Sequence, residues 1–282
     1  MSTVCIEKSV YVNVFSTFHK ALVDFSCEKL YNKYAMDKYT YNQDFLIKYC
    51  DADFKEEMKI STALAYLEEV ACASAEELGF GYQYIKEKNC AFIITNTSCE
   101  FLRPIRVGEI VKTQTWPLKP TFATFERQYR FIDEQGLPTV NAVSRWCLLD
   151  KQTGKILPSK TIDNQDYSTY NTDKVLNATW KIPTFETTGE TPRFTIKIGY
   201  SEYDHNMHVN NTRYADYCMN VFSIEELQDK RVAGFSIAYV RQCKEKETLR
   251  FFRKETDLGE FLVQGKNERE ETVVLAKISF AK

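Results

Sequence analysis

Residues 203–214 read Tyr203-Asp204-His205-Asn206-Met207-His208-Val209-Asn210-Asn211-Thr212-Arg213-Tyr214 and run into a segment with helical spacing. The stretch holds two of the three histidines of the chain, one aspartate and three asparagines. An asparagine side chain accepts hydrogen bonds from the free N–H groups of a first helical turn, so we expect Asn210 or Asn211 to start a helix. Asn206 and His208 would then lie beside the positive end of that helix, and we interpret the stretch as half of an active site.

The composition excludes several classes of protein. With 282 residues, 44% of them hydrophobic, the chain can bury one large core or two ordinary ones, which excludes a disordered protein. Lys and Arg number 37 against 39 Asp and Glu, so the net charge is −2 and there is no global basic field for a nucleic acid. We therefore expect no nucleic-acid partner.

The cysteines and the first residues indicate a compartment. Nine cysteines are scattered singly without CxxC pairs, which is typical of reduced thiols in a cytosolic protein. The start of the chain lacks a basic region followed by an apolar core, and no run approaches the roughly 20 apolar residues that span a bilayer. We expect a cytoplasmic protein without a membrane span. We also expect no metal site, because His205 and His208 are three apart outside a helix with no third histidine nearby.

The spacing of apolar and turn residues predicts an α+β protein. Residues 1–41 carry apolar side chains at helical spacing and are expected to form an N-terminal helical segment. A long helix is predicted over 61–78, with Ser61 as its cap and Gly79 as its end. Segments rich in β-branched and aromatic residues predict antiparallel strands at 41–49, 91–102, 110–117, 121–133 and 139–150.

A stretch rich in Pro, Gly and short polar residues divides the chain. We place a linker at 156–192, between a first domain at 42–155 and a second domain at 193–282. In the second domain the plan restarts with a predicted helix over 211–222. Strands are predicted around it at 193–200, 233–240, 248–255, 260–266 and 272–280.

Two short runs match between the halves at fixed offsets, as internal repeats do. A shift of 149 positions aligns Phe45 with Phe194, and a shift of 138 aligns residues 103–106 with 241–244. We interpret the chain as a tandem duplication of one α+β unit.

The alignment indicates which half carries the chemistry. With the shift of 149, the Asp, Asn and His of residues 204–208 align with residues of other types in the first half. These residues are Lys55, Glu57 and Lys59. With the shift of 138, Gln242 and Cys243 align with Pro104 and Ile105. We expect the second domain to be catalytic and the first to supply packing and an apolar tunnel.

The string Asp-x-Asn-x-His-Val-Asn-Asn at 204–211, followed by a helix and by Tyr-x-Arg-x-Cys at 239–243, resembles the acyl-acyl carrier protein (acyl-ACP) thioesterases of plant plastids and bacteria. Trp116, Trp146 and the segment 102–104 are secondary similarities. The resemblance implies two hotdog domains in tandem, each an antiparallel sheet wrapped around a long helix. It also implies release of a fatty acid from acyl carrier protein (ACP), with no metal, nucleotide or flavin cofactor.

The residues suit these roles chemically. Backbone N–H groups at the start of a helix, here at Asn210 and Asn211, polarise a thioester carbonyl as negative charge develops. Histidine is a common general acid and base at physiological pH, so His208 can accept a proton and pass one to the leaving thiolate. Asn206 can orient substrate or water, and Asp204 can fix the hydrogen-bond network of the site.

Two mechanisms stay open. In one, His208 activates Cys243 as an acylated nucleophile, and in the other, water attacks the thioester. Members of the family often carry Glu before the cysteine, where this chain has Gln242, which cannot act as a base but can position water. We favour water attack organised by Asp204, Asn206, His208 and Gln242.

The carrier of the acyl chain also stays open. Hydrolysis of acyl-coenzyme A, or non-catalytic binding of acyl thioesters, are the alternatives to acyl-ACP hydrolysis. Arg241, Lys244 and Lys246 are candidates for contact with the acidic surface of ACP. Because duplication makes the usual hotdog pair within one chain, we expect a monomer or a homodimer.

Overall fold

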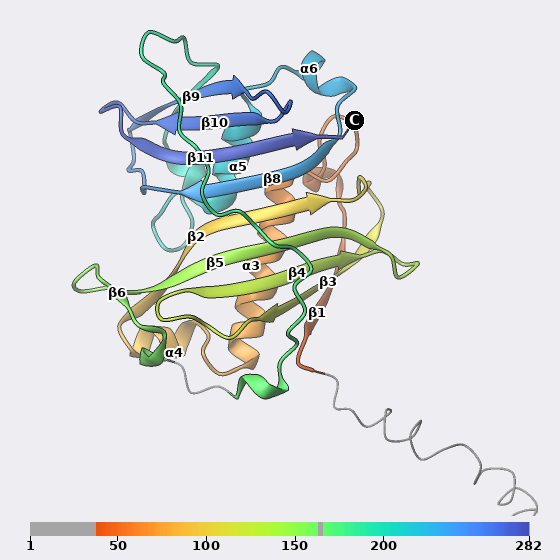
Figure 1. Ribbon diagram of the computed structural model, residues 1–282, viewed down its shortest axis with the longest axis vertical. Coiled ribbons are helices and arrows are strands. Elements are labelled where there is room, and N and C mark those ends of the chain that lie inside the picture. Colours follow the sequence, from red (N-terminus) through yellow and green to blue (C-terminus); the bar gives the residue numbers. More distant parts are fainter. Residues whose placement is uncertain (1–37, 163–165, 282) are drawn as a thin grey trace, which may run out of the picture. The chain divides into compact units, whose positions relative to one another are not determined.

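The computed structural model describes residues 38–162 and 166–281 (Figure 1). The helix predicted within residues 1–41 falls almost entirely on residues 1–37, outside the described residues. From Tyr41 onward, strands and two central helices dominate, which agrees with the predicted α+β class.

In the described residues, eleven strands form one sheet in which all paired strands are antiparallel. Its order is β1-β3-β4-β5-β2-β8-β11-β10-β9-β7, with β6 paired to β5. The order of the first half is mirrored in the second, and the halves meet where β2 pairs with β8 (Figure 1). The strands are β1 Tyr41–Leu46, β2 Cys90–Phe101, β3 Ile110–Pro117, β4 Phe125–Ile132, β5 Pro138–Asp150, β6 Ile156–Leu157, β7 Phe194–Lys197, β8 Val232–Tyr239, β9 Thr248–Glu255, β10 Phe261–Lys266 and β11 Thr272–Phe280.

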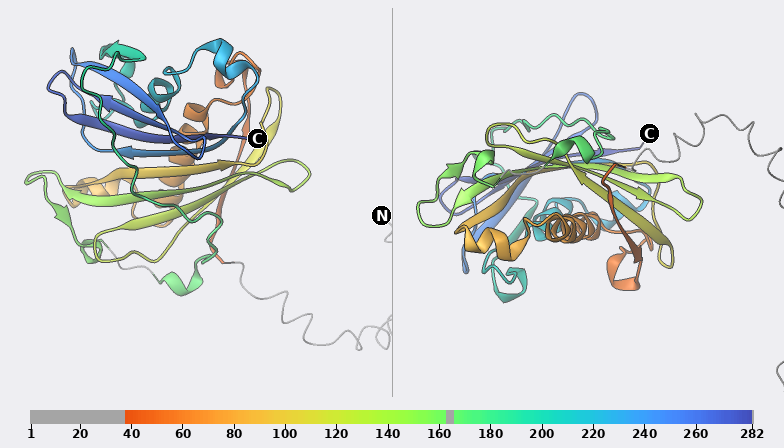
Figure 2. Two further views of the ribbon diagram at one scale, coloured as in Figure 1. Left: turned by 45° about the horizontal axis from the view of Figure 1, so that its top comes forward. Right: turned by 90° about the horizontal axis from the view of Figure 1, so that it is seen from below.

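Helices α3 (Ile60–Glu77) and α5 (Asn211–Met219) pack against each other on one face of the sheet (Figure 2). The apolar stripe of α3 is buried at Leu64 and Leu67, as the spacing predicts. These side chains belong to one core cluster with strand residues of both halves, including Phe131. Burial of each such side chain stabilises the fold by about 1.5–3 kcal/mol, so the core holds the two halves together.

The long helix starts one residue earlier than predicted. Lys59, not Ser61, is its N-cap, because the Lys59 N–H is already bonded to the Asp51 carbonyl at 3.0 Å and fixes the chain entry there. The helix ends at Glu77, one residue before the predicted end at 78. The predicted terminator Gly79 follows the cap Leu78 with φ +77°, a conformation that glycine accepts without strain. A short helix that the sequence did not predict, α4 (Tyr82–Glu87), follows.

The second central helix is shorter than predicted. α5 ends at Met219 rather than at 222 because a new helix, α6 (Ile224–Gln228), begins with its own capping box. There the Ser223 hydroxyl accepts the Glu226 N–H at 3.2 Å, and the Glu226 carboxylate accepts the Ser223 N–H at 2.9 Å. No helix in the described ranges combines the length and apolar character that crossing a bilayer requires.

The duplication recurs in the hydrogen bonds, with a shift of 151 rather than 149. Asp53 accepts the N–H groups two and four residues ahead with one carboxylate oxygen, at 2.8 and 3.2 Å, and Asp204 does the same at 2.8 and 3.3 Å. Glu56 and Met207 carry the matching positive φ angles of 59° and 60°. The predicted shift is wrong by two residues, because side chains alternate with a period of two along a strand and a slip of two keeps the apolar pattern.

The shift of 138 is confirmed. The Glu109 carboxylate accepts the Arg106 N–H at 2.8 Å, and the Glu247 carboxylate accepts the Lys244 N–H at 3.2 Å. Ile105 therefore remains the counterpart of the cysteine at 243. The corrected shift of 151 changes the other comparison: the first-half counterparts of Asp204, Asn206 and His208 are Asp53, Lys55 and Glu57.

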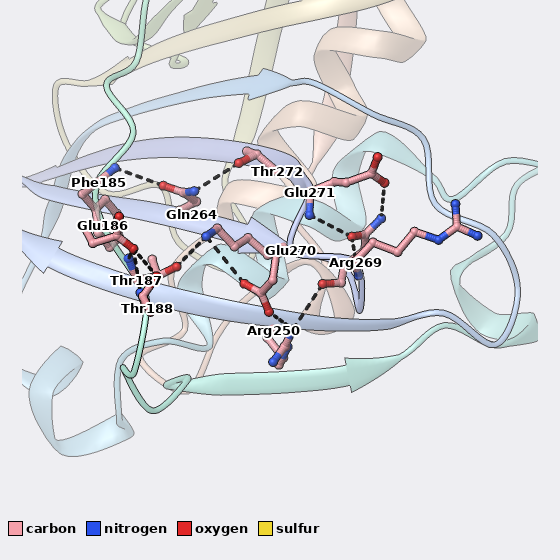
Figure 3. A network of polar contacts seen from close by, with 12 residues as sticks. Phe185, Glu186, Thr187, Thr188, Arg250, Gln264, Arg269, Glu270, Glu271 and Thr272 are labelled. Atoms are coloured by element: carbon pink, nitrogen blue, oxygen red, sulfur yellow. Dashed lines mark hydrogen bonds and ion pairs between the residues drawn. The ribbon is translucent and has the colours of Figure 1, made fainter.

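Residues 172–192 cross the face of the sheet opposite the helices (Figures 1 and 2). The buried Gln128 of β4 anchors this segment, because its side-chain oxygen accepts the N–H groups of residues 175–176 at 3.0 and 3.1 Å. Further along, the buried Gln264 of β10 accepts the Phe185 N–H at 3.1 Å (Figure 3). Buried glutamines thus tie the crossing segment to strands of both halves.

Candidate active site

Residues 203–209 form a closed loop that leads into α5. Tyr203 and Val209 make an antiparallel bridge, and the Asp204 N–H donates to the His208 carbonyl at 2.9 Å. One carboxylate oxygen of Asp204 accepts the N–H groups of Asn206 and His208. The Asp204 carboxylate is therefore engaged by the backbone of its own loop, as in an Asx turn.

The loop exposes the two polar side chains that the sequence singles out. Asn206 and His208 are both exposed, and neither side chain is hydrogen-bonded to another described residue. His205 is exposed as well, and its ring lies 6.4 Å from that of Tyr82. Both predicted groups are therefore free to meet a substrate.

The start of α5 leaves one backbone N–H unused. Asn210 is the N-cap, as predicted: its side-chain oxygen accepts the Thr212 N–H at 2.8 Å, and its own N–H is bonded to the Glu202 carbonyl at 2.8 Å. The Asn211 N–H has no acceptor among the described residues. Of the two predicted oxyanion residues, Asn211 thus offers the free donor at the positive helix end, and Asn210 shapes the turn.

The last residue of β8 and the segment after it lie against α5. The Tyr239 hydroxyl donates to the Asn211 carbonyl at 3.2 Å. Gln242 is exposed and its side chain makes no hydrogen bond to a described residue. Cys243 is only 1% exposed, and burial raises the pKa of its thiol to about 11, although a hydrogen bond with Tyr214 lowers it. Among the described residues, no hydrogen bond joins Cys243 to a histidine.

A small cavity with both polar and apolar lining residues, named here the inter-helix cavity, opens between the two central helices. It contains the first residues of α5, Asn211 and Thr212, together with Tyr239 and one acidic side chain, Glu68 of α3. The remaining lining residues are Leu64, Leu67, Ile94, Thr97, Tyr129, Ser144 and Trp146.

Glu68 is not among the site residues that the sequence motifs predict. Burial, and then the negative charge of Asp204, raise the pKa of its carboxyl, while His205 lowers it. The available signal was its position four residues after Leu64, where a carboxylate interrupts the edge of a buried helical stripe.

A larger apolar cavity lies next to the inter-helix cavity. It encloses about 710 Å³ of empty space, part of it open to solvent. The small α3 residues Ala71, Cys72 and Ala75 leave room for it, and Trp146 lines both cavities. The other lining residues are Phe80, Phe92, Pro117, Leu118, Phe125, Glu126, Arg127, Ile162 and Tyr167.

The predicted carrier-contact residues lie on the surface. Arg241, Lys244 and Lys246 are all exposed. Arg241 forms an ion pair with Glu271 at 3.2 Å. Their cationic groups are therefore accessible to a partner.

The fold and the site define a class of protein. Each half wraps an antiparallel sheet around a central helix, and the halves share one sheet through β2 and β8, so the chain is a double hotdog protein. The models of the acyl-ACP thioesterase N-terminal and C-terminal domains match residues 38–161 and 186–282. The chain belongs to the acyl-ACP thioesterase family.

Relatives in sequence include two plant proteins. A chloroplastic palmitoyl-acyl carrier protein thioesterase of Gossypium hirsutum is 23% identical over 222 residues, which cover 75% of this chain and 54% of that protein. One of Arabidopsis thaliana is 22% identical over 248 residues, covering 81% and 59%. The chain spans little more than half the length of the curated relatives it matches.

Two solved structures share the fold. An acyl-ACP thioesterase from Bacteroides thetaiotaomicron superposes with a TM-score of 0.79 at 24% identity, covering 86% of this chain and 98% of that one. The 12:0-ACP thioesterase from Umbellularia californica gives a TM-score of 0.76 at 14% identity, covering 86% and 97%. The predicted tandem hotdog fold is thereby confirmed.

Proposed function

We propose that the protein hydrolyses the thioester of fatty acyl-ACP, releasing free fatty acid and ending elongation of the acyl chain. One observation carries the proposal: Asn211, whose N–H has no acceptor among the described residues, lines the inter-helix cavity, and this cavity shares Trp146 with the apolar one. A thioester needs a donor for its carbonyl oxygen and a dry slot for its chain, and these two cavities supply both. Membership of the acyl-ACP thioesterase family supports the same chemistry.

In this reaction the carbonyl oxygen lies at the positive end of α5, where the Asn211 N–H stabilises the developing charge. His208 passes a proton to the leaving thiolate, and Asn206 orients the thioester by hydrogen bonding. Gln242 positions the attacking water. The buried thiol of Cys243, with its pKa raised to about 11, supports water rather than cysteine as the nucleophile.

The two domains have different roles in the proposed reaction. The first, at 42–155, holds the acyl chain in the apolar cavity, and the second, at 193–282, supplies the helix end and His208. Trp146 lines both cavities, so the chain passes this side chain on its way from one to the other. Within the proposed linker at 156–192, residues 172–192 cross the opposite face of the sheet and tie the two domains together.

The carrier is ACP in this proposal, and Arg241, Lys244 and Lys246 meet its acidic surface. Exposed cations attract an acidic partner and mainly raise the association rate. Reversing the charge of Lys244 and Lys246 should raise KM for acyl-ACP several-fold and leave hydrolysis of a short acyl-pantetheine thioester unchanged.

The proposal is tested by presenting one acyl group on two carriers. Thiol release from acyl-ACP and acyl-coenzyme A is measured in parallel, and kcat/KM is expected to be higher with ACP. A higher value with coenzyme A would favour the acyl-coenzyme A alternative. Absence of thiol release from both, with acyl thioester still bound, would make the protein a non-catalytic binding module.

A further inference from the structure

The inter-helix cavity joins a carboxylate of one domain to the catalytic helix end of the other. Glu68 comes from α3 in the first half, and Asn211 and Thr212 come from α5 in the second. Tyr239, which donates to the Asn211 carbonyl, completes the polar side of the cavity. Among the described residues lining this space, Glu68 is the one with a carboxylate.

Apart from His208, which serves the leaving thiolate in the proposed reaction, the other candidate site residues supply no free base for water. Gln242 carries an amide, which cannot accept a proton from water. The Asp204 carboxylate accepts two N–H groups of its own loop, and Asp53 makes the same two bonds in the half without the histidine. Because both repeats keep this aspartate in the same turn, Asp204 serves the shape of the loop. Glu68 is then the carboxylate left for chemistry.

The duplication supplies an independent comparison. A shift of 151 relates Glu68 to Met219, and it relates Asn211 to Ile60 at the start of α3. The equivalent place in the other half therefore combines Ile60 with Met219, both apolar. Of these two equivalent positions in the repeat, the one with Glu68 and Asn211 combines a carboxylate with a polar helix start. This is the position of the inter-helix cavity.

Several charged or titratable groups face Glu68. Burial and the negative charges of Asp204 and Glu69 raise the pKa of its carboxyl, and His205 lowers it. Glu68 in turn raises the pKa values of Tyr239 and Cys72. A carboxylate whose pKa is raised holds a proton more tightly, which makes it a stronger base towards water.

We infer that Glu68, supplied by the first domain, is the general base that activates water at the start of α5. The inference rests on the proposed thioester hydrolysis. Glu68 takes one proton from water as the water oxygen bonds to the carbonyl carbon, and the carbonyl electron pair moves to the oxygen held by the Asn211 N–H. The carbonyl then re-forms, the carbon–sulfur bond breaks, and the leaving thiolate receives the proton from Glu68 through His208. Acid and free thiol are the products.

The test compares Glu68→Gln with Glu77→Gln, a control on an exposed carboxylate of the same helix that is not among the groups facing Glu68. With acyl-ACP, Glu68→Gln should lose about 10²- to 10⁴-fold in kcat/KM, the usual size of a general-base contribution, and Glu77→Gln should match wild type. Glu68→Asp should recover part of the loss. The acidic limb of the wild-type pH profile should lie above the ordinary glutamate pKa of 4.5 and be absent in Glu68→Gln.

A second readout separates base catalysis from a structural role. Hydroxylamine attacks thioesters without needing a base, so Glu68→Gln should lose much less in hydroxamate formation than in hydrolysis. An equal loss in both reactions, or a Glu68→Gln variant with the wild-type rate and acidic limb, would overturn the assignment of Glu68 alone. No thiol release by the wild-type protein from acyl-ACP or acyl-coenzyme A would overturn the proposed function and this assignment with it.

Discussion

Ser98 and Ser236 face each other where β2 pairs with β8, with their hydroxyl oxygens 2.9 Å apart. They are 138 positions apart, the shift that also relates Glu109 to Glu247, so each serine is the repeat counterpart of the other. The approximate twofold axis of the molecule therefore passes between these two hydroxyl groups. The inter-helix cavity lies where this symmetry brings α3 of one half against α5 of the other.

The serine pair is expected to contribute to the joint between the halves. Ser98→Ala or Ser236→Ala leaves one hydroxyl without its partner, which should cost about 1–2 kcal/mol of unfolding free energy. The double variant should cost less than the sum of the two, because no hydroxyl is then left unpaired. Urea unfolding of all four proteins measures the coupling, and strictly additive losses would show that the pair does not interact.

Asp204 is expected to act through the backbone and not through its charge. Asp204→Asn keeps an oxygen that accepts the two loop N–H groups, so turnover should stay within a few-fold of wild type. Asp204→Ala removes both bonds and should lower turnover together with about 1–2 kcal/mol of stability. Asp53→Ala is the matched control, with a similar loss of stability and an unchanged kcat. A hundred-fold loss in a well-folded Asp204→Asn variant would instead assign the charge a catalytic role.

Cys243 is expected to be a packing residue. It is 1% exposed, and its repeat counterpart Ile105 is 2% exposed, so both fill the same place in their halves. Cys243→Ala should keep most of the turnover and lose about 1 kcal/mol, while Ile105→Ala should lose about 2–5 kcal/mol because it leaves a larger cavity. Mass spectrometry of the wild-type protein during turnover checks this assignment. An acyl group found covalently bound to Cys243 would contradict it and support cysteine as the nucleophile.

Glu68 is expected to reduce stability at neutral pH. Since its pKa is raised in the folded protein, the native state binds this proton more tightly than the unfolded chain does. The stability gained from the protonated carboxyl is present below about pH 4.5 and is lost as the pH rises through the raised pKa. Glu68→Gln should therefore be more stable than wild type at pH 8, by a margin that shrinks towards pH 4.5. Urea midpoints at both pH values measure this margin, and a less stable variant at pH 8 would contradict it.

Features that depend only on neighbouring residues in the chain were predicted well from the sequence. The strands at 110–117, 248–255 and 272–280 agree residue for residue, because alternating side chains and flanking turn residues set them. Asn210 was likewise readable as a cap, since its role needs only the next two residues.

Features that depend on contacts between segments far apart in the sequence could not be predicted in this way. A slip of two residues keeps the strand pattern, so the alternation could not separate a shift of 149 from one of 151. Only the paired turns at Asp53 and Asp204 decide it. Glu68 lines the inter-helix cavity because α3 meets α5 of the other half, and helical spacing alone gives no information on that contact.

The length of the acyl chain is expected to depend on small residues of α3. Ala75 lines the apolar cavity, and Leu at this position would fill part of the space with a larger side chain. Ala75→Leu should therefore shift the released fatty acids towards shorter chains and lower kcat/KM most for the longest substrate. Ala65→Leu, on the exposed side of the same helix, is the matched control and should leave the product profile unchanged. Chain-length profiles of both variants, measured on a series of acyl-ACPs, decide the matter: an unchanged Ala75→Leu profile would place the acyl chain outside this cavity.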